Sequence, residues 1–406
     1  MGYHHFDSDR SQPVLTLMSR LRVWVALTLM VVATGVLVAA CASSAGPLRS
    51  VLEPGATPMP AEARLDVIEW ARLAQNAHNY QSWRIVLDDE RDDRFSVFVE
   101  ERRLLPQTDP FSRQIVISVG TFLAVVDARA AQLGYRADIE LLPDGDLDLA
   151  LIGSRSAALV TLVPDRAARS RYAAAADHDA ITAATVKYRY HPAQIDDALV
   201  ARVESYATDQ VRIEIVSDPE AVAWLNDLSL RAFTIEMEHE PTLMETYASS
   251  RMNGRARRES PYGLAFTANF PKRSLWFMDA MMTIAPQRPA AFARTGIRLY
   301  ERALDQITTY VVVSTAGNYR RTQIEVGLAL QALWMELHAS GHVVLANSQA
   351  LQEYPEMAEL YDEVHRRLAS DGATVQMLLA VACPAPGAHR FSPRIAAVDL
   401  IDPRGQ

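Results

Sequence analysis

Apolar residues recur with helical spacing in two stretches of the chain that lie a constant 207 residues apart. Arg113, Ile117, Val119, Gly120, Leu123 and Gly134 return as Arg320, Ile324, Val326, Gly327, Leu330 and Gly341. A glycine inside a helix costs about 1 kcal/mol relative to alanine, so Gly120 and Gly327 indicate closely approaching neighbours, while the last glycine of each set fits a helix C-cap. The pattern predicts two related halves in tandem, with a site at the seam where a homodimer would have its interface.

Further apolar runs predict the other elements. Strands are expected at 85–87, 95–101, 138–142, 158–163, 211–217, 308–315, 375–383 and 395–401, and helices at 61–74, 110–133 and 196–207. Asp109 and Pro110 fit the N-cap and the first position of the second helix, which is too apolar to lie on the surface and is predicted to be central and buried. The mixture predicts an α+β fold with one half over 61–180 and the other over 181–406.

The second half contains a long segment that the first half lacks. Residues 219–300 have no counterpart of similar length, and they hold a basic run followed by an apolar run. We predict a lid insertion over about 230–300, because functional segments are often added as loops on a rigid scaffold. The alternative is a helical excursion that completes the core.

The N-terminus has the features of an export signal. An uncharged stretch, 23–42, follows two arginines and ends in Val-Ala-Ala-Cys41, which resembles a bacterial lipobox. We therefore predict a signal and lipoprotein segment over 1–41, lipidated at Cys41, and a flexible tether over 42–60. This places the protein in the cell envelope, membrane-anchored and facing the extracytoplasmic side. The alternative is an uncleaved signal anchor, since twenty apolar residues can also span a bilayer.

Composition excludes several classes of protein. A formal net charge of −9 argues against a nucleic-acid partner, which would need a basic face. If Cys41 is lipidated, only Cys383 remains and no internal disulfide can form. No phosphate-loop or nucleophile-elbow motif is present. His338 and His342 stand four residues apart, but Gly341 ends their helix, so no metal site is predicted.

A polar loop, 75–84, leads from the first predicted helix into the first strand. Its amide, imidazole and guanidinium donors suit the carbonyls and ring nitrogens of a planar heterocycle. The alternative is a self-satisfied loop whose Asn and Ser side chains cap neighbouring helices, with Trp83 in the core. The residues alone leave both interpretations open.

Three segments resemble the nitroreductase family. The run from Asn76 to Trp83 resembles the motif Ser-x-x-Asn-x-Gln-Pro-Trp, with a serine in place of the usual proline. Residues 321–351 resemble the family's central helix and the flavin-facing loop that follows it, and Ser392-Pro393-Arg394 resembles the closing segment whose arginine binds the flavin phosphate. The likeness covers nearly all of 61–402 and is greatest to the fused, lid-bearing Acg-like branch.

This resemblance implies a nitroreductase-like fold built as a monomeric pseudo-dimer, because ordinary members bind FMN at a homodimer interface. The likeness assigns a set of polar residues to one FMN: Asn76, His78, Asn79 and Gln81 from the first half, and Lys187, Arg189, Asn347, Ser348 and Arg394 from the second. Lys187 and Arg189 match the family's phosphate motif only in basic character, and with Arg394 they would hold the phosphate. The first half opens without such a motif, so at most one flavin per chain is expected.

The implied activity is that of an FMN-dependent oxidoreductase, in which NAD(P)H reduces the flavin and the flavin reduces a nitro- or quinone-like acceptor. A flavin accounts for the missing catalytic motifs, because electron and hydride transfer belong to its ring. Two alternatives stay open. One is a catalytically silent protein that binds or sequesters flavin, which is what the resemblance to the lid-bearing branch implies, because a lid shuts the flavin ring from substrates. The other is a membrane-tethered scaffold whose pocket has decayed.

Overall fold

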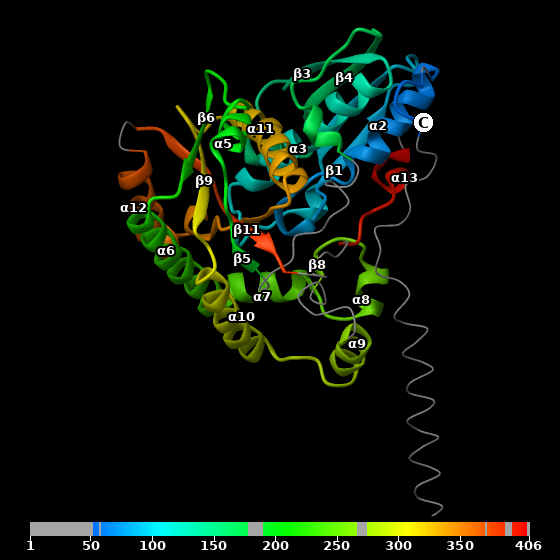
Figure 1. Cartoon of the computed structure of the whole chain (residues 1–406). Helices are drawn as coiled ribbons and strands as arrows, with labels where there is room; N and C mark the ends of the chain where they lie inside the picture. The colour runs from blue at the N-terminus through cyan, green and yellow to red at the C-terminus, as the bar shows by residue number, and fades with distance from the viewer. Residues whose placement is uncertain are drawn as a thin grey trace, which may run out of the picture.

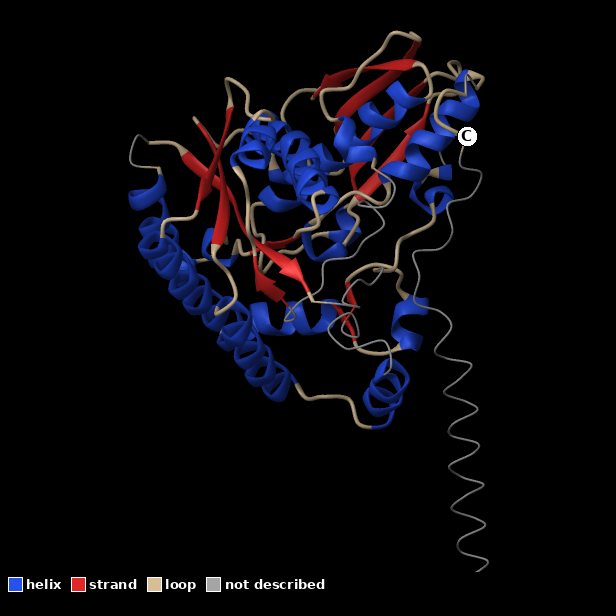
Figure 2. Cartoon of the chain, viewed as in Figure 1, coloured by secondary structure: helices blue, strands red, loops and turns tan. Residues whose placement is uncertain are grey.

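The computed structural model describes residues 52–56, 58–177, 190–265, 274–369, 372–385 and 392–403. The predicted signal and lipoprotein segment, most of the predicted tether, and the predicted phosphate ligands Lys187 and Arg189 lie outside these residues. Within them the fold is α+β, with two antiparallel sheets on either side of a central helix pair (Figures 1 and 2).

The first half forms a four-stranded sheet in the order β1-β2-β4-β3, in which every neighbouring pair is antiparallel. Its elements are α2 (Pro60–Ala71), β1 (Trp83–Leu87), β2 (Arg94–Val99), α3 (Arg113–Gln132), β3 (Tyr135–Leu141), β4 (Ser156–Pro164) and the 3-10 turn η4 (Ala173–Ala176). Short 3-10 turns also occur at η1 (Ala77–Asn79), η2 (Glu101–Arg103) and η3 (Leu149–Leu151).

The second half repeats this order of elements. Its sheet runs β6-β9-β11-β10, again antiparallel, and β5 adds to β11. Its elements are β5 (Tyr190–Pro192), α5 (Asp197–Glu204), β6 (Val211–Val216), β9 (Thr309–Thr315), α11 (Arg320–Ala339), β10 (Val343–Ala346), η7 (Gln349–Leu351), η8 (Pro355–Met357), α12 (Ala358–Leu368) and β11 (Thr374–Pro384). The predicted repeat therefore extends from one helix to a whole sheet in each half.

The repeated helices α3 and α11 cross where their glycines meet. A β-carbon on Gly120 would lie 2.7 Å from the Cα of Gly327, and one on Gly327 would lie 2.7 Å from the Cα of Gly120. Any side chain at either position would therefore collide with the backbone of the other helix. The inference of a close neighbour is confirmed. Gly134 and Gly341 follow the helix ends with φ of +78° and +84°, as predicted for C-caps.

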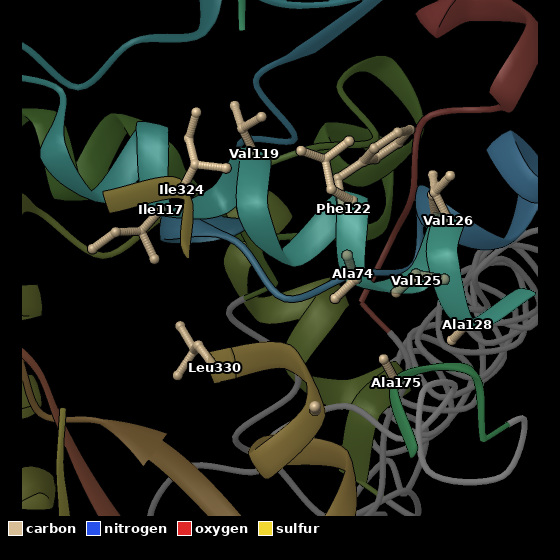
Figure 3. Close-up of a cluster of buried hydrophobic side chains, with 14 of the residues drawn as sticks. Ala74, Ile117, Val119, Phe122, Val125, Val126, Ala128, Ala175, Ile324 and Leu330 are labelled. Carbon is tan, nitrogen blue, oxygen red and sulfur yellow. The ribbon is translucent and has the colours of Figure 1, made fainter. Parts of the chain in front are cut away.

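The helix pair also organises the main hydrophobic core. Figure 3 shows one part of it, where Val119 and Phe122 of α3, Ile324 and Leu330 of α11 and Ala175 of η4 contribute to one cluster. Helix α3 is long and apolar enough to cross a membrane, but 83% of that stretch is buried inside the fold. It is therefore the central core helix that its composition predicted.

The insertion lies between β6 and β9, where the first half has only the short β1–β2 connection. It contains α6 (Pro219–Glu238), α7 (Glu240–Ser249), β7 (Ser250–Arg251), α8 (Gly254–Glu259), β8 (Leu264–Ala265), α9 (Leu275–Ile284) and α10 (Pro289–Leu304). Leu225 of α6 and Leu304 of α10 belong to the same buried cluster as Leu378 of β11, so these two helices complete the core of the second half. Helices α7, α8 and α9 extend beyond it (Figure 1).

Two local predictions were wrong. Helix α3 begins at Arg113 and not at Pro110. Asp109 still caps it from a distance, because its carboxylate accepts hydrogen bonds from the backbone N–H groups of Gln114 and Ile115 at 3.2 and 3.0 Å. Residues 395–401 form no strand. They contain the short helix α13 (Ala397–Leu400), and only Ile401 bridges to Ile85 of β1.

Candidate functional site

A cavity of about 340 Å³ lies at the seam between the halves. Such a volume falls in the range of small-molecule and cofactor pockets. Its walls come from the loop after α2, from α3 and α11, from the loop after β10, from the C-terminal segment and from the insertion. Six of the nine predicted cofactor residues line it: Asn76, His78, Asn79, Asn347, Ser348 and Arg394.

The loop after α2 has an unusual backbone. His78, Asn79 and Gln81 have φ of 47°, 55° and 50°, in the left-handed region that is costly for residues other than glycine. Such strain persists only where surrounding contacts hold it, and it clusters at functional sites. Here α3 supplies the hydroxyl of Ser118, which accepts from the N–H of Ala77 at 3.1 Å.

Helix α11 holds the other end of the same loop. The amide oxygen of Gln331 accepts from the backbone N–H of Gln75 at 2.9 Å, and the hydroxyl of Thr121 on α3 donates to the carbonyl of Gln75 at 2.6 Å. One helix from each half therefore fixes the position at which the loop enters the cavity wall.

Gln81 acts as an internal brace and does not line the cavity. Its side chain is fully buried, its oxygen accepts from the N–H of Ile395 at 2.7 Å, and its nitrogen donates to the carbonyl of Pro261 at 3.0 Å. Asn79 works in the same way, donating to the carbonyls of Gly263 and Pro393 at 3.0 and 2.9 Å. These two side chains join the loop to the insertion and to the C-terminal segment.

Arg394 reaches the cavity from the C-terminal segment. It donates to the side-chain oxygen of Asn79 and, at 3.1 Å, to the carbonyl of Leu73. No acidic side chain in the described part of the chain pairs with it. Burial, together with the positive charge of Arg72, lowers the pKa of Arg394 to about 10. A half-buried guanidinium that no carboxylate among the described residues neutralises is a favourable position for an anion.

Asn347 and Ser348 lie on the opposite wall, directly after β10. The amide of Asn347 donates to the hydroxyl of Tyr310 at 3.3 Å, and the hydroxyl of Ser348 lies 3.2 Å from both the carbonyl and the N–H of Leu378. Strands β9 and β11 thus fix both side chains at the rim of the second sheet.

Asp109 is a cavity residue that sequence reasoning had taken only as a helix cap. It is 5% exposed, and burial raises its pKa to about 6, although Arg113 and two backbone N–H groups oppose the shift. Its carboxyl group therefore titrates close to neutral pH. The pKa of Asp109 is raised because its side chain is buried, and the sequence alone does not show that burial.

The insertion forms the remaining wall. Phe233 and Met237 of α6, with Phe292 and Tyr300 of α10, give it an apolar surface. Helix α7 joins it to the first half, because the carboxylate of Glu245 accepts from the N–H groups of Gln107 and Thr108 at 3.0 and 2.8 Å. The hydroxyls of Tyr80 and Ser249 add a bond of 2.8 Å.

Several of these residues could not be found from sequence patterns. Gln331, Ser118, Thr121 and Glu245 carry no motif, and their roles depend on helix crossings and long-range docking. His338 and His342 have separate partners, since His338 accepts from the indole of Trp334 at 3.0 Å and His342 lies 3.2 Å from the carbonyl of Gln194. Among the described residues, no three potential metal ligands gather.

No protein-family model matches the sequence, and no curated protein matches it either. Among solved structures, it is similar to a putative NADH dehydrogenase/NAD(P)H nitroreductase from Parabacteroides distasonis, with 11% identity, 53% of this chain and 90% of that chain covered, and a TM-score of 0.28. It is also similar to the FMN-dependent nitroreductase NfnB from Mycobacterium smegmatis in complex with NADPH. That match has 14% identity, covers 53% of this chain and 91% of that chain, and has a TM-score of 0.33. A putative nitroreductase from Anabaena variabilis is similar as well, with 9% identity, 81% of this chain and 90% of that chain covered, and a TM-score of 0.35.

Proposed function

We propose that the chain binds one FMN in the seam cavity and acts as an oxidoreductase, taking electrons from NAD(P)H and passing them to a nitro- or quinone-like acceptor. The observation that carries this proposal is convergence. Six of the nine residues assigned from the motif resemblance, drawn from three distant parts of the sequence, line a single cavity. Unrelated polar residues would have no reason to meet there.

The cavity fits the cofactor in two respects. Its volume of about 340 Å³ suits a ligand of this class, and its lining includes both amide side chains and apolar rings. The half-buried cation Arg394, which has no acidic partner among the described residues, suits the phosphate. Asn79 fits less well, because its side chain is already engaged with backbone carbonyls, so we assign it the role of holding the loop and Arg394 in place.

Each remaining residue then has a defined task. Arg394 would bind the phosphate, while Asn347, Ser348 and the strained loop at Asn76 and His78 would orient the ring by hydrogen bonds. A bound flavin would supply the electron and hydride transfer, for which the chain has no catalytic motif of its own. Lys187 and Arg189 stay candidate phosphate ligands on sequence grounds alone.

A second candidate function is flavin sequestration without turnover. It is favoured by the bonds that join the insertion to the first half, namely Glu245 to Thr108 and Tyr80 to Ser249. These bonds hold the insertion wall against the cavity, and a second substrate would need that wall to move.

The first experiment is the absorption spectrum of the purified full-length chain before and after addition of FMN. A bound flavin that NADH or NADPH bleaches without oxygen supports the oxidoreductase. A bound flavin that neither reductant bleaches supports sequestration, and protein that binds no FMN in a calorimeter contradicts both.

A matched pair of variants separates the two functions further. Glu245→Ala releases α7 from the first half, whereas Glu259→Ala removes an exposed carboxylate that pairs with Arg255 on α8. If the insertion blocks access, Glu245→Ala should speed the bleaching by NAD(P)H and Glu259→Ala should not. Equal rates in both variants would argue against a blocking role.

We also propose that the protein is held at a membrane of the cell envelope through Cys41, on the extracytoplasmic side. The support is the sequence of residues 23–42, which has the pattern of a lipoprotein signal. Cys41→Ser should release the chain into the soluble fraction if the lipid is the anchor. Continued membrane association of that variant would favour an uncleaved signal anchor.

A further inference from the structure

Helix α9 presents a row of large apolar side chains to solvent. Trp276 is 47% exposed, Phe277 49%, Met281 39% and Ile284 73%. At helical spacing these four residues share one face. Asp279 points the other way and forms a buried ion pair with Arg257 of α8 at 2.8 Å. The pair fixes how α9 is rotated, so the apolar face is turned outward by a specific contact.

The surroundings of this face are strongly basic. Residues 251–298 contain nine Arg and Lys against two acidic residues, whereas the whole chain has a formal net charge of −9. Arg255 and Arg258 on α8 are exposed, and so is Arg288, the N-cap residue of α10. Figure 1 shows α9 at one end of the molecule, away from both sheets. Positive charge and exposed aromatic side chains therefore coincide at one end of an acidic protein.

We propose that this end rests on an anionic phospholipid bilayer, with α9 lying in the headgroup plane and its apolar face inserted. We define the membrane-contact surface as Trp276, Phe277, Met281 and Ile284 with the flanking Arg255, Arg258 and Arg288. Interfacial helices combine these features, because large apolar residues enter the acyl boundary while arginines bind anionic headgroups. Tryptophan is moreover enriched at membrane interfaces.

The charge distribution favours lipid over a protein partner. An anionic bilayer repels an acidic protein at every orientation except one that directs a basic patch toward it. The predicted N-terminal anchor would keep the chain beside the bilayer, so even weak contact becomes an intramolecular equilibrium. The inference does not depend on flavin binding, and failure of either proposal leaves the other standing.

The test uses the full-length chain in vesicles of phosphatidylglycerol and phosphatidylcholine whose acyl chains are brominated, because bromine quenches tryptophan only at contact. The emission lost to bromine, which is the difference in tryptophan fluorescence between unbrominated and brominated vesicles, should fall in Trp276→Phe. It should stay at the wild-type value in Trp224→Phe, whose indole donates to Glu363 at 2.6 Å and lies within the fold. Trp24 of the N-terminal segment contributes equally to both variants and cancels in the comparison.

Two further arms test charge and partner. Arg255→Ala and Arg258→Ala should each shift the contact equilibrium about fivefold toward the free state, and neutral vesicles should do the same. Equal quenching in wild type and Trp276→Phe overturns the proposal. If Trp276 instead becomes shielded from solvent as the protein density on the vesicles rises, whatever the lipid charge, the apolar face binds a second copy of the chain. That result overturns the proposal as well.

Discussion

The two sides of the α3–α11 pair are related by the 207-residue repeat, and the cavity described above lies on one of them. On the open side Ser118 of α3 and Trp334 of α11 line the cavity. Their counterparts on the other side are Glu325 and Asp127. There Ser170 donates a hydrogen bond to the carboxylate of Asp127. Burial raises the pKa of Tyr172, and the negative charges of Asp127 and Glu325 raise it further.

The segment that closes the second side is short and apolar. Ala175 and Ala176 of η4 are buried against α3 and α11. The open side is instead walled by the long loop after α2, whereas the corresponding connection after α5 is only 205–210. A repeat can thus keep its core symmetric while one of its two seams becomes a site and the other becomes packing.

The largest expected effect comes from breaking the axis that both sides share. In Gly327→Val the new side chain would collide with the backbone of α3 at Gly120, because even a β-carbon would lie 2.7 Å from its Cα. Unfolding free energy should fall by about 4 kcal/mol or more, as in severely overpacked cores. Chemical denaturation followed by circular dichroism measures it.

Gly296→Ala is the control for that substitution. Gly296 lies in α10, where a β-carbon would make an ordinary contact at 3.7 Å with Phe233. We expect no loss, or a gain of up to about 1 kcal/mol from helix propensity. A similar loss in both variants would show that the crossing is not specific.

How much of this could be predicted differs between core and site. Gly120 and Gly327 were readable because a helix-interior glycine leaves a pattern that repeats. Asn76, His78, Asn347, Ser348 and Arg394 could be placed by resemblance to a motif. The brace formed by Gln81 could not, since its meaning depends on Pro261 and Ile395, which lie 180 and 314 residues away. Closure of the second seam left no sequence signal beyond an Ala-rich run.

The next effect is a pH dependence that belongs to the open side. Asp109 has a pKa raised from 3.8 to about 6, and the residue at the repeat position is Ala316. The folded state keeps its proton where the unfolded chain has lost it. The contribution of Asp109 to folding stability is therefore fully present below about pH 3.8 and is lost as pH rises through 6, which lowers the free energy of unfolding by about 3 kcal/mol.

Asp109→Asn should flatten that part of the stability curve, measured by denaturation between pH 4 and pH 7. Asp138→Asn provides the control, because Asp138 is exposed and its pKa is lowered by Arg136. In Asp138→Asn the free energy of unfolding should still fall between pH 4 and 6, as in the wild type. An unchanged curve in Asp109→Asn would place the titrating group elsewhere.

The next prediction tests whether Arg394, on the open side, binds the phosphate of FMN. Arg394→Gln should weaken FMN binding by about 2 kcal/mol, or roughly thirtyfold, because a charge-assisted bond to phosphate is lost. Riboflavin, which has no phosphate, should bind equally to both proteins. Isothermal titration calorimetry measures all four affinities.

Arg84→Gln is the matched control for Arg394→Gln. Arg84 pairs with Asp402 at 3.1 Å and holds the same C-terminal segment, but it does not line the cavity. FMN affinity should not change in it. An equal loss for FMN and riboflavin in Arg394→Gln would mean that the arginine shapes the pocket without binding phosphate.

The smallest effect comes from reopening the closed side. Tyr172→Ala removes a half-buried ring that packs on the core, so unfolding free energy should fall by about 1 to 2 kcal/mol. The emptied space would still be bordered by the carboxyl groups of Asp127 and Glu325, which repel a phosphate and present no amide donors. Calorimetry should therefore find no more than one FMN per chain in this variant, as in the wild type. Two bound flavins would show that the ring alone closes the second seam, and that the acidic residues have no part in making the halves different.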